Sequence, residues 1–342
     1  MGAGGLDMAK KLTINDIARL ANTSKTTVSF YLNGRFENMS QETRLRIQKV
    51  IEETNYAPNI AARFLSNSKT NLVGILVGDI TNSFSNQLVK GIEACANERN
   101  YQIIMSSSNY DFEMERRHVE RLLQIGVDGF IVQPTRNFSR LVKLIQESGK
   151  EIVFIDSNLQ DDTVASVKSD NYTSVYNCID RIIESNQYDE YIMIGADATK
   201  LSTRQERSKG FIDAVSKHNK MYQNIIVSNN ASEAEVSTKL IEHIKLGVRS
   251  VIFVPNCWLL PTVYLVLSKY RALIPQTIGL VGLDNTEWTG FVSPTVTTIV
   301  QPAYEEGHLV MSKLADLIEK KENVNIKEVM LCQVNWKESI NI

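Results

Sequence analysis

The chain has 342 residues, 43% of them hydrophobic, and a formal net charge of −2. This length exceeds that of one typical domain, and the hydrophobic content is enough to bury a large core. The most apolar stretch, residues 251–267, is interrupted by Pro255, Asn256 and Pro261, which favours a strand followed by a helix over a membrane span. The sequence has no internal repeat and no low-complexity segment.

The cysteines and the first residues indicate the compartment. The four cysteines are widely scattered and lack metal-ligand spacing, so we interpret them as free, buried thiols in a reducing cytoplasm; they are Cys95, Cys178, Cys257 and Cys332. The opening residues MGAGGLD lack the charged start and apolar core of a secretory signal. We expect residues 1–10 to be a flexible tail, and the protein to be cytoplasmic, without a membrane partner, a metal or another cofactor.

Residues 12–32, LTINDIARLANTSKTTVSFYL, contain two short helical patterns that meet at a polar break. In the first pattern apolar residues recur at i, i+3, i+4 and i+7, with Thr13 placed to cap the first turn and Asp16 three residues later. The polar run NTS ends this period, and its serine, Ser24, is placed to cap the second helix. The inner faces of the two predicted helices are Ile14, Ile17, Ala18 and Ala21, and Val28, Tyr31 and Leu32.

The outer face of the second predicted helix carries Lys25, Thr26, Ser29 and Phe30. Short polar side chains and a lysine at the start of a helix suit the base edges and phosphates of a DNA major groove. The pattern therefore indicates a helix-turn-helix that presents its second helix to DNA. The alternative for this stretch is an ordinary helical hairpin with a solvated face.

A third helical pattern begins at Ser40 and ends before Pro58, since a proline stops a helix at or before the residue that precedes it. Its predicted inner face is Ile47, Val50, Ile51 and Thr54. Residues 59–66, NIAARFLS, then form a helical pattern of about two turns, which is too short to be stable alone in water. This last segment needs a partner in order to fold.

The N-terminal segment is basic, whereas the rest of the chain is acidic. Between Lys10 and Lys69 there are ten lysines and arginines against five acidic residues, a net charge of +5, so the remainder of the chain sums to −7. A basic segment of this kind indicates a polyanionic partner, because the counterions that it displaces from the polyanion contribute much of the affinity.

The segments TINDIARLANTSKTTVSFYLNG and SQETRLRIQKVIEETNYAPNIAARFLSN resemble the headpiece and hinge of the lactose-repressor and galactose-repressor (LacI/GalR) family of bacterial transcription regulators. The similarity continues at lower density to near the C-terminus. It implies a DNA-binding headpiece over residues 11–57, a hinge helix over residues 58–68 and an effector-binding core over residues 70–342. The partners that it implies are double-stranded operator DNA, a small sugar, sugar acid or sugar phosphate, and a second copy of the chain.

In this family the hinge helices of two subunits pair and insert a leucine into the minor groove, which bends the operator. Leu65 stands at the matching position with Ala62 beside it; the alternative is that Leu65 is a linker residue that packs on the core. The family usually has arginine where this chain has Phe30, which can touch a thymine methyl but cannot form a bidentate contact to guanine. The expected DNA-contacting residues are Thr13, Ser24, Lys25, Thr26, Thr27, Ser29, Phe30, Asn33, Asn59, Ala62, Arg63 and Leu65.

From residue 71 onward, short apolar runs alternate with amphipathic helical patterns, which is typical of βαβ units and a parallel sheet. We expect an α/β protein, with an all-α helix-turn-helix headpiece and two doubly wound parallel-sheet lobes of the periplasmic-binding-protein type. The predicted strands are residues 72–77, 102–105, 129–132, 152–155, 191–194, 225–227, 251–254 and 278–281. The predicted helices are residues 86–99, 113–124, 141–148, 172–184, 204–217, 233–245 and 259–269. The expected lobes are an N-lobe, residues 71–168 and 302–332, and a C-lobe, residues 169–300 and 333–342.

Polar residues follow the predicted strands at the edge where such sheets bind ligands, outside the carboxyl ends of the strands. They are Asp79 and Asn82 with Phe84, then Gln133, Asp156, Asp170, Asn256 and Asp284. Any one of these can instead be a helix cap or a turn residue. Their joint placement at strand ends is what indicates a binding cleft.

The family resemblance assigns roles to several of these positions. GDITNSFSNQLVKGIE resembles the connection whose aromatic residue, here Phe84, packs on the effector, and STRQERSKGF matches the pattern whose arginine, here Arg207, binds effector hydroxyls. VGLDNT resembles the motif whose aspartate, here Asp284, binds a sugar. Asn256 of VPN can be carried over, but Cys257 replaces the usual aspartate. The complete expected effector site is Asp79, Asn82, Phe84, Gln133, Asp156, Asp170, Thr203, Arg207, Asn256, Asp284 and Gln301.

An arginine and a carboxylate across a polar cleft suit a hydroxylated ligand, and a further cation, Arg204 or Lys168, would favour an acidic one, although both can equally be surface charges.

A sugar-uptake binding protein has the same core but needs an export signal and no basic headpiece. An enzyme needs a nucleophile motif, a phosphate loop or metal spacing, and none accompanies His118, His218, His243 and His308. The sequence favours a transcription regulator of the repressor type, controlled by an effector, and no enzymatic activity.

Overall fold

The computed structural model describes residues 12–32, 34–56, 69–157, 159, 163–245, 247–283, 286–322 and 325–342. The chain divides into two compact units, residues 1–70 and 71–342, which we call the headpiece and the core and describe separately. No helix within the described ranges is long and apolar enough to cross a membrane. The predicted tail and hinge helix lie outside the described residues, as do the predicted site residues Asn33, Asn59, Ala62, Arg63, Leu65 and Asp284.

The described part of the headpiece is a small helical unit around an apolar centre. Its elements are α1 (Ile14–Leu20), α2 (Lys25–Leu32), the 3₁₀ turn η1 (Phe36–Asn38) and α3 (Gln41–Thr54). Ile17, Val28 and Ile47, one from each α-helix, are fully buried at this centre. The break between α1 and α2 contains Asn22 in the left-handed region, with φ 47°, a conformation that asparagine tolerates. The three helices predicted from apolar periodicity are confirmed.

Each lobe of the core is built on one six-stranded sheet, with strand orders β11-β5-β4-β3-β1-β2 in the N-lobe and β12-β10-β9-β8-β6-β7 in the C-lobe. Neighbouring described strands are parallel, except that β12 runs antiparallel to β10. The N-lobe strands are β1 (Leu72–Val77), β2 (Gln102–Ser107), β3 (Gly129–Val132), β4 (Glu151–Ile155), β5 (Ala165–Ser169) and β11 (Lys327–Met330). The C-lobe strands are β6 (Glu190–Ala196), β7 (Met221–Val227), β8 (Ser250–Val254), β9 (Ile278–Leu283), β10 (Thr297–Val300) and β12 (Gln333–Asn335).

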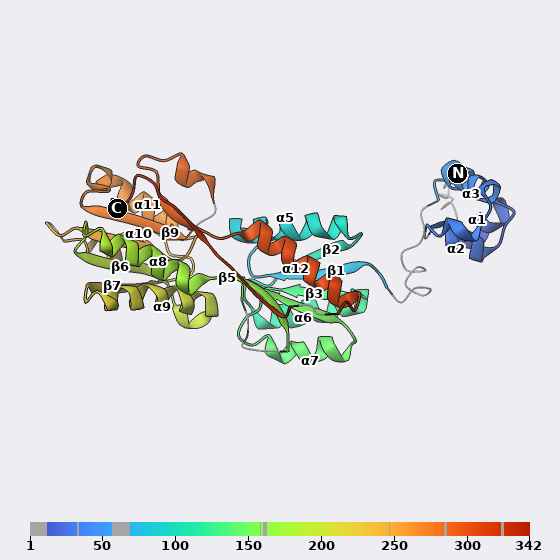
Figure 1. The fold of residues 1–342 in the computed structure, drawn as a ribbon, viewed down its shortest axis with the longest axis horizontal. Coiled ribbons are helices and arrows are strands. Elements are labelled where there is room, and N and C mark those ends of the chain that lie inside the picture. The colour runs from blue at the N-terminus through green and yellow to red at the C-terminus, as the bar shows by residue number, and fades with distance from the viewer. Residues whose placement is uncertain are drawn as a thin grey trace, which may run out of the picture. The chain divides into compact units, whose positions relative to one another are not determined.

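Helices cover both faces of each sheet, which confirms the predicted doubly wound α/β class (Figure 1). The N-lobe helices are α5 (Ser83–Glu98), α6 (Phe112–Ile125), α7 (Ser139–Glu147) and α12 (Ala303–Ile318). The C-lobe helices are α8 (Asn171–Glu184), α9 (Ser202–Lys217), α10 (Glu233–Ile241) and α11 (Leu260–Leu267), with 3₁₀ turns η2 (Ala198–Lys200), η3 (Ser268–Leu273) and η4 (Glu287–Gly290).

Two predicted helices were too long at their C-terminal ends. The pattern predicted helix to residue 245, but α10 ends at Ile241, and the next residues form turns in which the His243 N–H donates to the Leu240 carbonyl at 3.1 Å. The helix predicted over residues 259–269 ends at Leu267 and continues as the tighter turn η3. Helix ends fray into i to i+3 bonding, which apolar periodicity does not distinguish from α-helix.

The chain passes between the lobes three times, because β5 ends at Ser169, β10 at Val300 and β11 at Met330. As a result α12 follows C-lobe strands in the sequence but packs on the N-lobe sheet, where Val310, Met311 and Leu314 are fully buried. The sequence pattern did not predict α12 or the strands β5, β10, β11 and β12. These strands form one end of each sheet, and α12 packs on the N-lobe sheet.

Helices α5 and α12 lie side by side in the N-lobe and touch through their backbones (Figure 1). A Cβ atom on Gly307 would lie 2.0 Å from the carbonyl oxygen of Leu88, and a Cβ atom on Gly91 would lie 2.0 Å from that of Tyr304. No side chain fits at either position, so the two glycines allow the helices to approach this closely.

We predict that Gly307→Ala lowers the free energy of unfolding of the core by about 1–3 kcal/mol, the usual cost of overpacking, because its methyl group meets backbone that cannot rotate away. Urea unfolding followed by circular dichroism measures this. The control is Glu305→Ala on the exposed side of the same helix, which should change stability by less than about 0.5 kcal/mol. Equal stability of the two variants would contradict the close backbone contact.

Candidate functional site

The start of α2 presents the predicted DNA-contacting side chains at the surface of the headpiece. Lys25 and Thr26 are exposed, while Thr27, Ser29 and Phe30 are partly buried. Ser24 caps the helix: its Oγ accepts the N–H of Thr27 at 3.1 Å and lies 2.8 Å from the Thr27 hydroxyl. A helix N-terminus that presents hydroxyl groups and a lysine at the surface has the chemistry that binds a DNA phosphate.

Thr13 caps α1 in a reciprocal arrangement with Asp16. The backbone N–H and the hydroxyl of Thr13 donate to Asp16 Oδ2 at 2.9 and 2.7 Å, and the Asp16 N–H donates to Thr13 Oγ1 at 3.4 Å. This capping box confirms the predicted start of α1. It also keeps the Thr13 hydroxyl at an exposed helix N-terminus.

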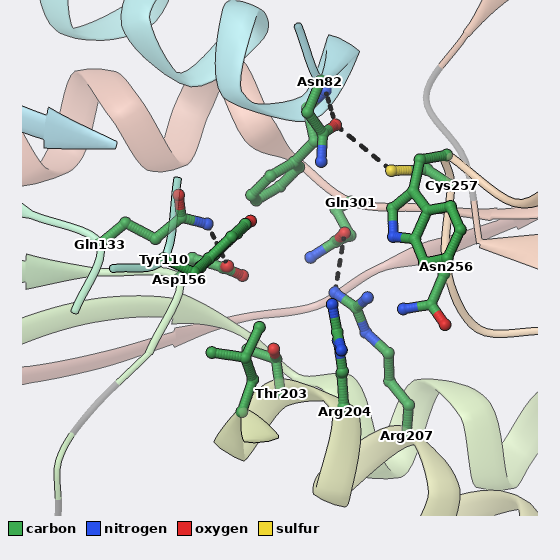
Figure 2. Close-up of a pocket in the computed structure, with 13 residues that line it drawn as sticks. Asn82, Tyr110, Gln133, Asp156, Thr203, Arg204, Arg207, Asn256, Cys257 and Gln301 are labelled. Atoms are coloured by element: carbon green, nitrogen blue, oxygen red, sulfur yellow. Dashed lines mark hydrogen bonds between the residues drawn. The ribbon is translucent and has the colours of Figure 1, made fainter. Parts of the chain in front are cut away.

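A pocket of about 440 Å³, including its open mouth, lies between the two lobes of the core. Figure 2 shows its side chains pointing from both lobes toward one space. The lining residues are Asn82, Phe84, Tyr110, Gln133 and Asp156 from the N-lobe, Leu201, Thr203, Arg204, Arg207, Asn256, Cys257 and Trp258 from the C-lobe, and Gln301 from the crossing after β10.

The structure brings together most of the predicted effector residues. Those that line the pocket are Asn82, Phe84, Gln133, Asp156, Thr203, Arg207, Asn256 and Gln301. Asp79 and Asp170 do not line it. The Asp79 carboxylate accepts the N–H and hydroxyl of Thr81, and Asp170 caps α8 by accepting the N–H of Thr173 at 3.0 Å. These two are the turn and cap residues that the alternative interpretation described.

Sequence reasoning missed Tyr110, Leu201 and Trp258, and it considered Arg204 only as a further cation. Tyr110 follows the carboxyl end of β2, just as the predicted polar site residues follow other strands. An aromatic residue after a predicted strand could therefore have indicated Tyr110 as a pocket residue. Its backbone is left-handed, with φ 57°. Its ring lies directly on Gly78, where a Cβ atom would come within 2.2 Å of the ring.

Arg207 is buried at the back of the pocket and is held by neutral acceptors. Its Nε donates to Asn171 Oδ1 at 2.7 Å, and one terminal nitrogen donates to the Pro255 carbonyl at 3.0 Å. The other terminal nitrogen donates to Gln301 Oε1 at 3.3 Å (Figure 2). Neighbouring Asn256 is fixed as well, since its Oδ1 accepts the N–H of Ala196 at 2.9 Å. The guanidinium plane is therefore oriented before any ligand arrives.

Arg204 lies one turn before Arg207 on α9 and is also buried, at 9% exposure. Its Nη1 donates to Asn229 Oδ1 at 3.1 Å and to the Asp197 carbonyl at 3.5 Å. Burial lowers the pKa of Arg204. In contrast, Lys168, the other cation that the sequence suggested, forms an ion pair with Glu206.

Two carboxyl groups meet on the N-lobe side of the pocket. Asp156, whose backbone is left-handed at φ 64°, accepts the side-chain amide of Gln133 at 2.7 Å through Oδ2. Glu306 of α12 is fully buried behind it and accepts the N–H of Asp156 at 3.0 Å and the hydroxyl of Ser169 at 2.9 Å. Burial, and then the charge of Asp156, raise the pKa of Glu306 well above its usual range. Burial also raises the pKa of Asp156 against the charge of Arg207.

We predict that Glu306 makes the stability of the core fall as the pH rises. A carboxyl group whose pKa is raised by folding contributes its stabilisation below the usual value near 4.5 and loses it as the pH passes the raised value. Melting temperatures between about pH 4 and 8 should therefore decline less with pH for Glu306→Gln than for the wild type. Glu305→Gln, an exposed neighbour on the same helix, is the control and should follow the wild type. Parallel curves for Glu306→Gln and the wild type would show that this carboxyl group does not titrate differently on folding.

Comparison with known proteins gives two family matches. Residues 13–59 match the family described as bacterial regulatory proteins, lacI family, and residues 70–335 match periplasmic binding proteins and sugar binding domain of LacI family. The chain is 28% identical over 336 residues to the probable HTH-type transcriptional regulator EndR of Paenibacillus polymyxa, covering 96% of this chain and 98% of the relative. It is 29% identical to the HTH-type transcriptional regulator KdgR of Bacillus subtilis (strain 168), covering 90% of this chain and 91% of the relative.

Among solved structures, the lac repressor dimer bound to operator and the anti-inducer ONPF shares the fold. Its TM-score is 0.83 at 19% identity, and the match covers 96% of this chain and 99% of that one. The headpiece match includes the capping residues of α1 and α2, and the core match includes every described residue that lines the pocket. The chain therefore belongs to the LacI family and is a DNA-binding transcription regulator.

Proposed function

We propose that this regulator is a homodimeric repressor whose affinity for operator DNA is set by a small acidic sugar derivative bound between the lobes of the core. The observation that carries this proposal is the pair of buried arginines in the pocket. Within the described residues, the hydrogen bonds given for Arg204 and Arg207 end on neutral amide and carbonyl oxygens, and the carboxyl groups of Asp197 and Asp156 act on them through their charge. A buried cation without a paired carboxylate is costly, and a ligand carboxylate or phosphate supplies the missing charge.

The remaining charges of the pocket support an anionic ligand. Among the described residues that line the pocket, Asp156 supplies the carboxyl group, and burial raises its pKa, which weakens it as a counter-ion for the arginines. Cys257 occupies the position at which the family resemblance implies an aspartate, and its thiol donates to Asn82 Oδ1 at 3.3 Å. Replacing a carboxylate by a thiol removes a negative charge from the wall. The pocket thus carries more positive charge than a neutral sugar needs.

The polar and aromatic groups around the arginines suit the hydroxylated part of such a ligand. Asn82, Gln133, Asn256 and Thr203 offer hydrogen-bonding atoms from both lobes, and the rings of Phe84, Tyr110 and Trp258 offer apolar faces. A sugar ring presents hydroxyl groups at its edge and C–H groups on its faces, so it matches both kinds of side chain. Sugar acids and sugar phosphates combine these features with a charge.

Coupling to DNA follows from ligand contacts on both lobes. The lobes already touch near the pocket, where the Ser157 and Ser202 hydroxyls lie 2.6 Å apart and Arg136 donates to the Thr199 carbonyl at 3.0 Å. A ligand that binds one spacing of the lobes better than another shifts the equilibrium between them. We infer that paired cores pass this shift to the two headpieces and to the hinge segments predicted from the sequence.

Two alternative functions, sugar uptake and enzymatic catalysis, are less well supported. The basic headpiece has no use in a sugar-uptake binding protein, and family membership favours a regulator. The pocket side chains hold one another by hydrogen bonds, which suits the binding of a ligand. We infer that the protein binds its ligand without converting it. A regulator of this kind binds chromosomal DNA, so we infer that it acts in the cytoplasm of a bacterial cell.

The first test of this proposal is ligand charge. We predict that sugar acids or sugar phosphates raise the melting temperature, whereas the corresponding neutral sugars do not, in a thermal-shift screen of gluconate, glucuronate, 6-phosphogluconate, glucose and galactose. Arg204→Gln should weaken binding of the acidic ligand by about tenfold or more, since a hydrogen bond to a charged group contributes about 1.5–3 kcal/mol. Arg121→Gln, an exposed arginine on α6, is the control. Binding of neutral sugars alone would contradict an acidic effector.

The second test is the DNA contact of α2. We predict that Lys25→Gln weakens binding to a duplex selected by the protein from random sequences. Losing one phosphate contact should also reduce the slope of log affinity against log salt by about 0.9 per subunit. Fluorescence anisotropy at several salt concentrations measures both. Lys49→Gln on the exposed face of α3 is the control. An unchanged slope for Lys25→Gln would place the lysine away from the phosphates.

A further inference from the structure

Three potential metal ligands meet on the N-lobe, away from the pocket. Cys95 and Glu98 lie three residues apart on α5, so they share one face of the helix, and His308 approaches them from α12. One ligand atom from each residue lies within 4.8 Å of the other two. His308 and Glu98 are 210 positions apart, which is why no spacing in the sequence indicated this cluster.

The two glycine contacts hold these side chains in place. His308 directly follows Gly307, which touches the α5 backbone, and Cys95 lies one turn after Gly91, which touches the α12 backbone. Cys95 is 2% exposed and therefore fixed by packing, whereas Glu98 and His308 reach the surface. Ligands on two rigid, locked helices lose little entropy when they bind an ion.

The donor set and its spacing match a zinc ion. Thiolate, imidazole and carboxylate are the three ligand types that zinc binds in proteins, with bonds of about 2.0–2.3 Å. Tetrahedral geometry then places imidazole nitrogen and carboxylate oxygen about 3.3 Å apart. In the structure, His308 Nε2 and Glu98 Oε2 are 3.2 Å apart. An exposed His–Glu ion pair would add little stability by itself.

We propose that Cys95, Glu98 and His308 bind one zinc ion, with water as the fourth ligand, and that the ion links α5 to α12. This site is separate from the effector pocket and does not depend on the proposed function. Binding displaces the thiol proton, since the metal takes the thiolate, and the proton passes to solvent.

The charges around the cluster are compatible with a cation. Burial, followed by the charge of Glu98, raises the pKa of the Cys95 thiol, so the ion has to compete with a proton there. Arg99, a nearby positive charge, forms ion pairs with Asp316 and Glu319, which Lys321 also contacts, so these two cations and two carboxylates balance one another. The cation therefore meets a net negative surrounding once Cys95 is a thiolate.

The test uses the full chain, freed of metal with a chelator, and zinc alone as the probe. Titration against a chromogenic zinc chelator should show one bound zinc ion per chain. His308→Gln and Cys95→Ser should each weaken binding by about tenfold or more, comparable to the loss seen when metal-site partners are removed. The matched controls are His243→Gln and Cys332→Ser, which remove an imidazole and a thiol elsewhere in the core and should bind as the wild type does.

Cobalt gives a second readout that separates ligation from folding. Bound Co²⁺ should show a thiolate charge-transfer band in the wild type and in both controls. The band should disappear in Cys95→Ser even if some metal still binds. The exposed variant Glu98→Gln covers the case in which replacing buried Cys95 unfolds the chain, and it should also weaken zinc binding. Zinc affinity that is unchanged in Glu98→Gln and His308→Gln, or no stoichiometric binding in the wild type, would overturn the site.

Discussion

The arrangement of the pocket depends on the hydrogen bonds of one buried guanidinium group. Arg207 reaches from α9 to acceptors on three other segments, the start of α8, the end of β8 and the crossing after β10. Each acceptor is a fixed amide or carbonyl oxygen, so the cation is oriented without being neutralised. Because Asn171, Pro255 and Gln301 come from three different segments, this one group holds three parts of the pocket wall around the charge that it offers to a ligand.

Much of this architecture could be predicted from local pattern. The capping box of Thr13 and Asp16 and the apolar faces of α1 to α3 are encoded within a few residues, and the structure places them as expected. The strands that are buried on both faces, such as β3 and β8, were equally visible as apolar runs. These features depend on neighbours in sequence, which periodicity reports directly.

Other features depend on contacts between distant segments. β5 (ASVKS) and β10 (TTIV) are short and rich in small or hydroxylated residues, so their sequences do not indicate apolar strands. They form strands because a neighbouring strand pairs with each of them. Tyr110 enters the pocket only because Gly78 leaves room for its ring. Glu306 reads as a surface residue of an amphipathic helix, yet it is buried because the end of β4 and Ser169 cover it. Asp79 and Asp170 differ in that they follow the strand-end rule but accept hydrogen bonds from residues two and three positions later, and they do not line the pocket.

The three crossings between the lobes restrict how the core can move. Two bodies joined by a single strand could rotate about any axis, whereas three roughly adjacent tethers after β5, β10 and β11 remove most relative translations and twists. What remains is bending about a line through the tethers. A small molecule that draws the lobes together would therefore produce the same motion whatever its chemistry, so chemical selectivity and the mechanical response can evolve separately.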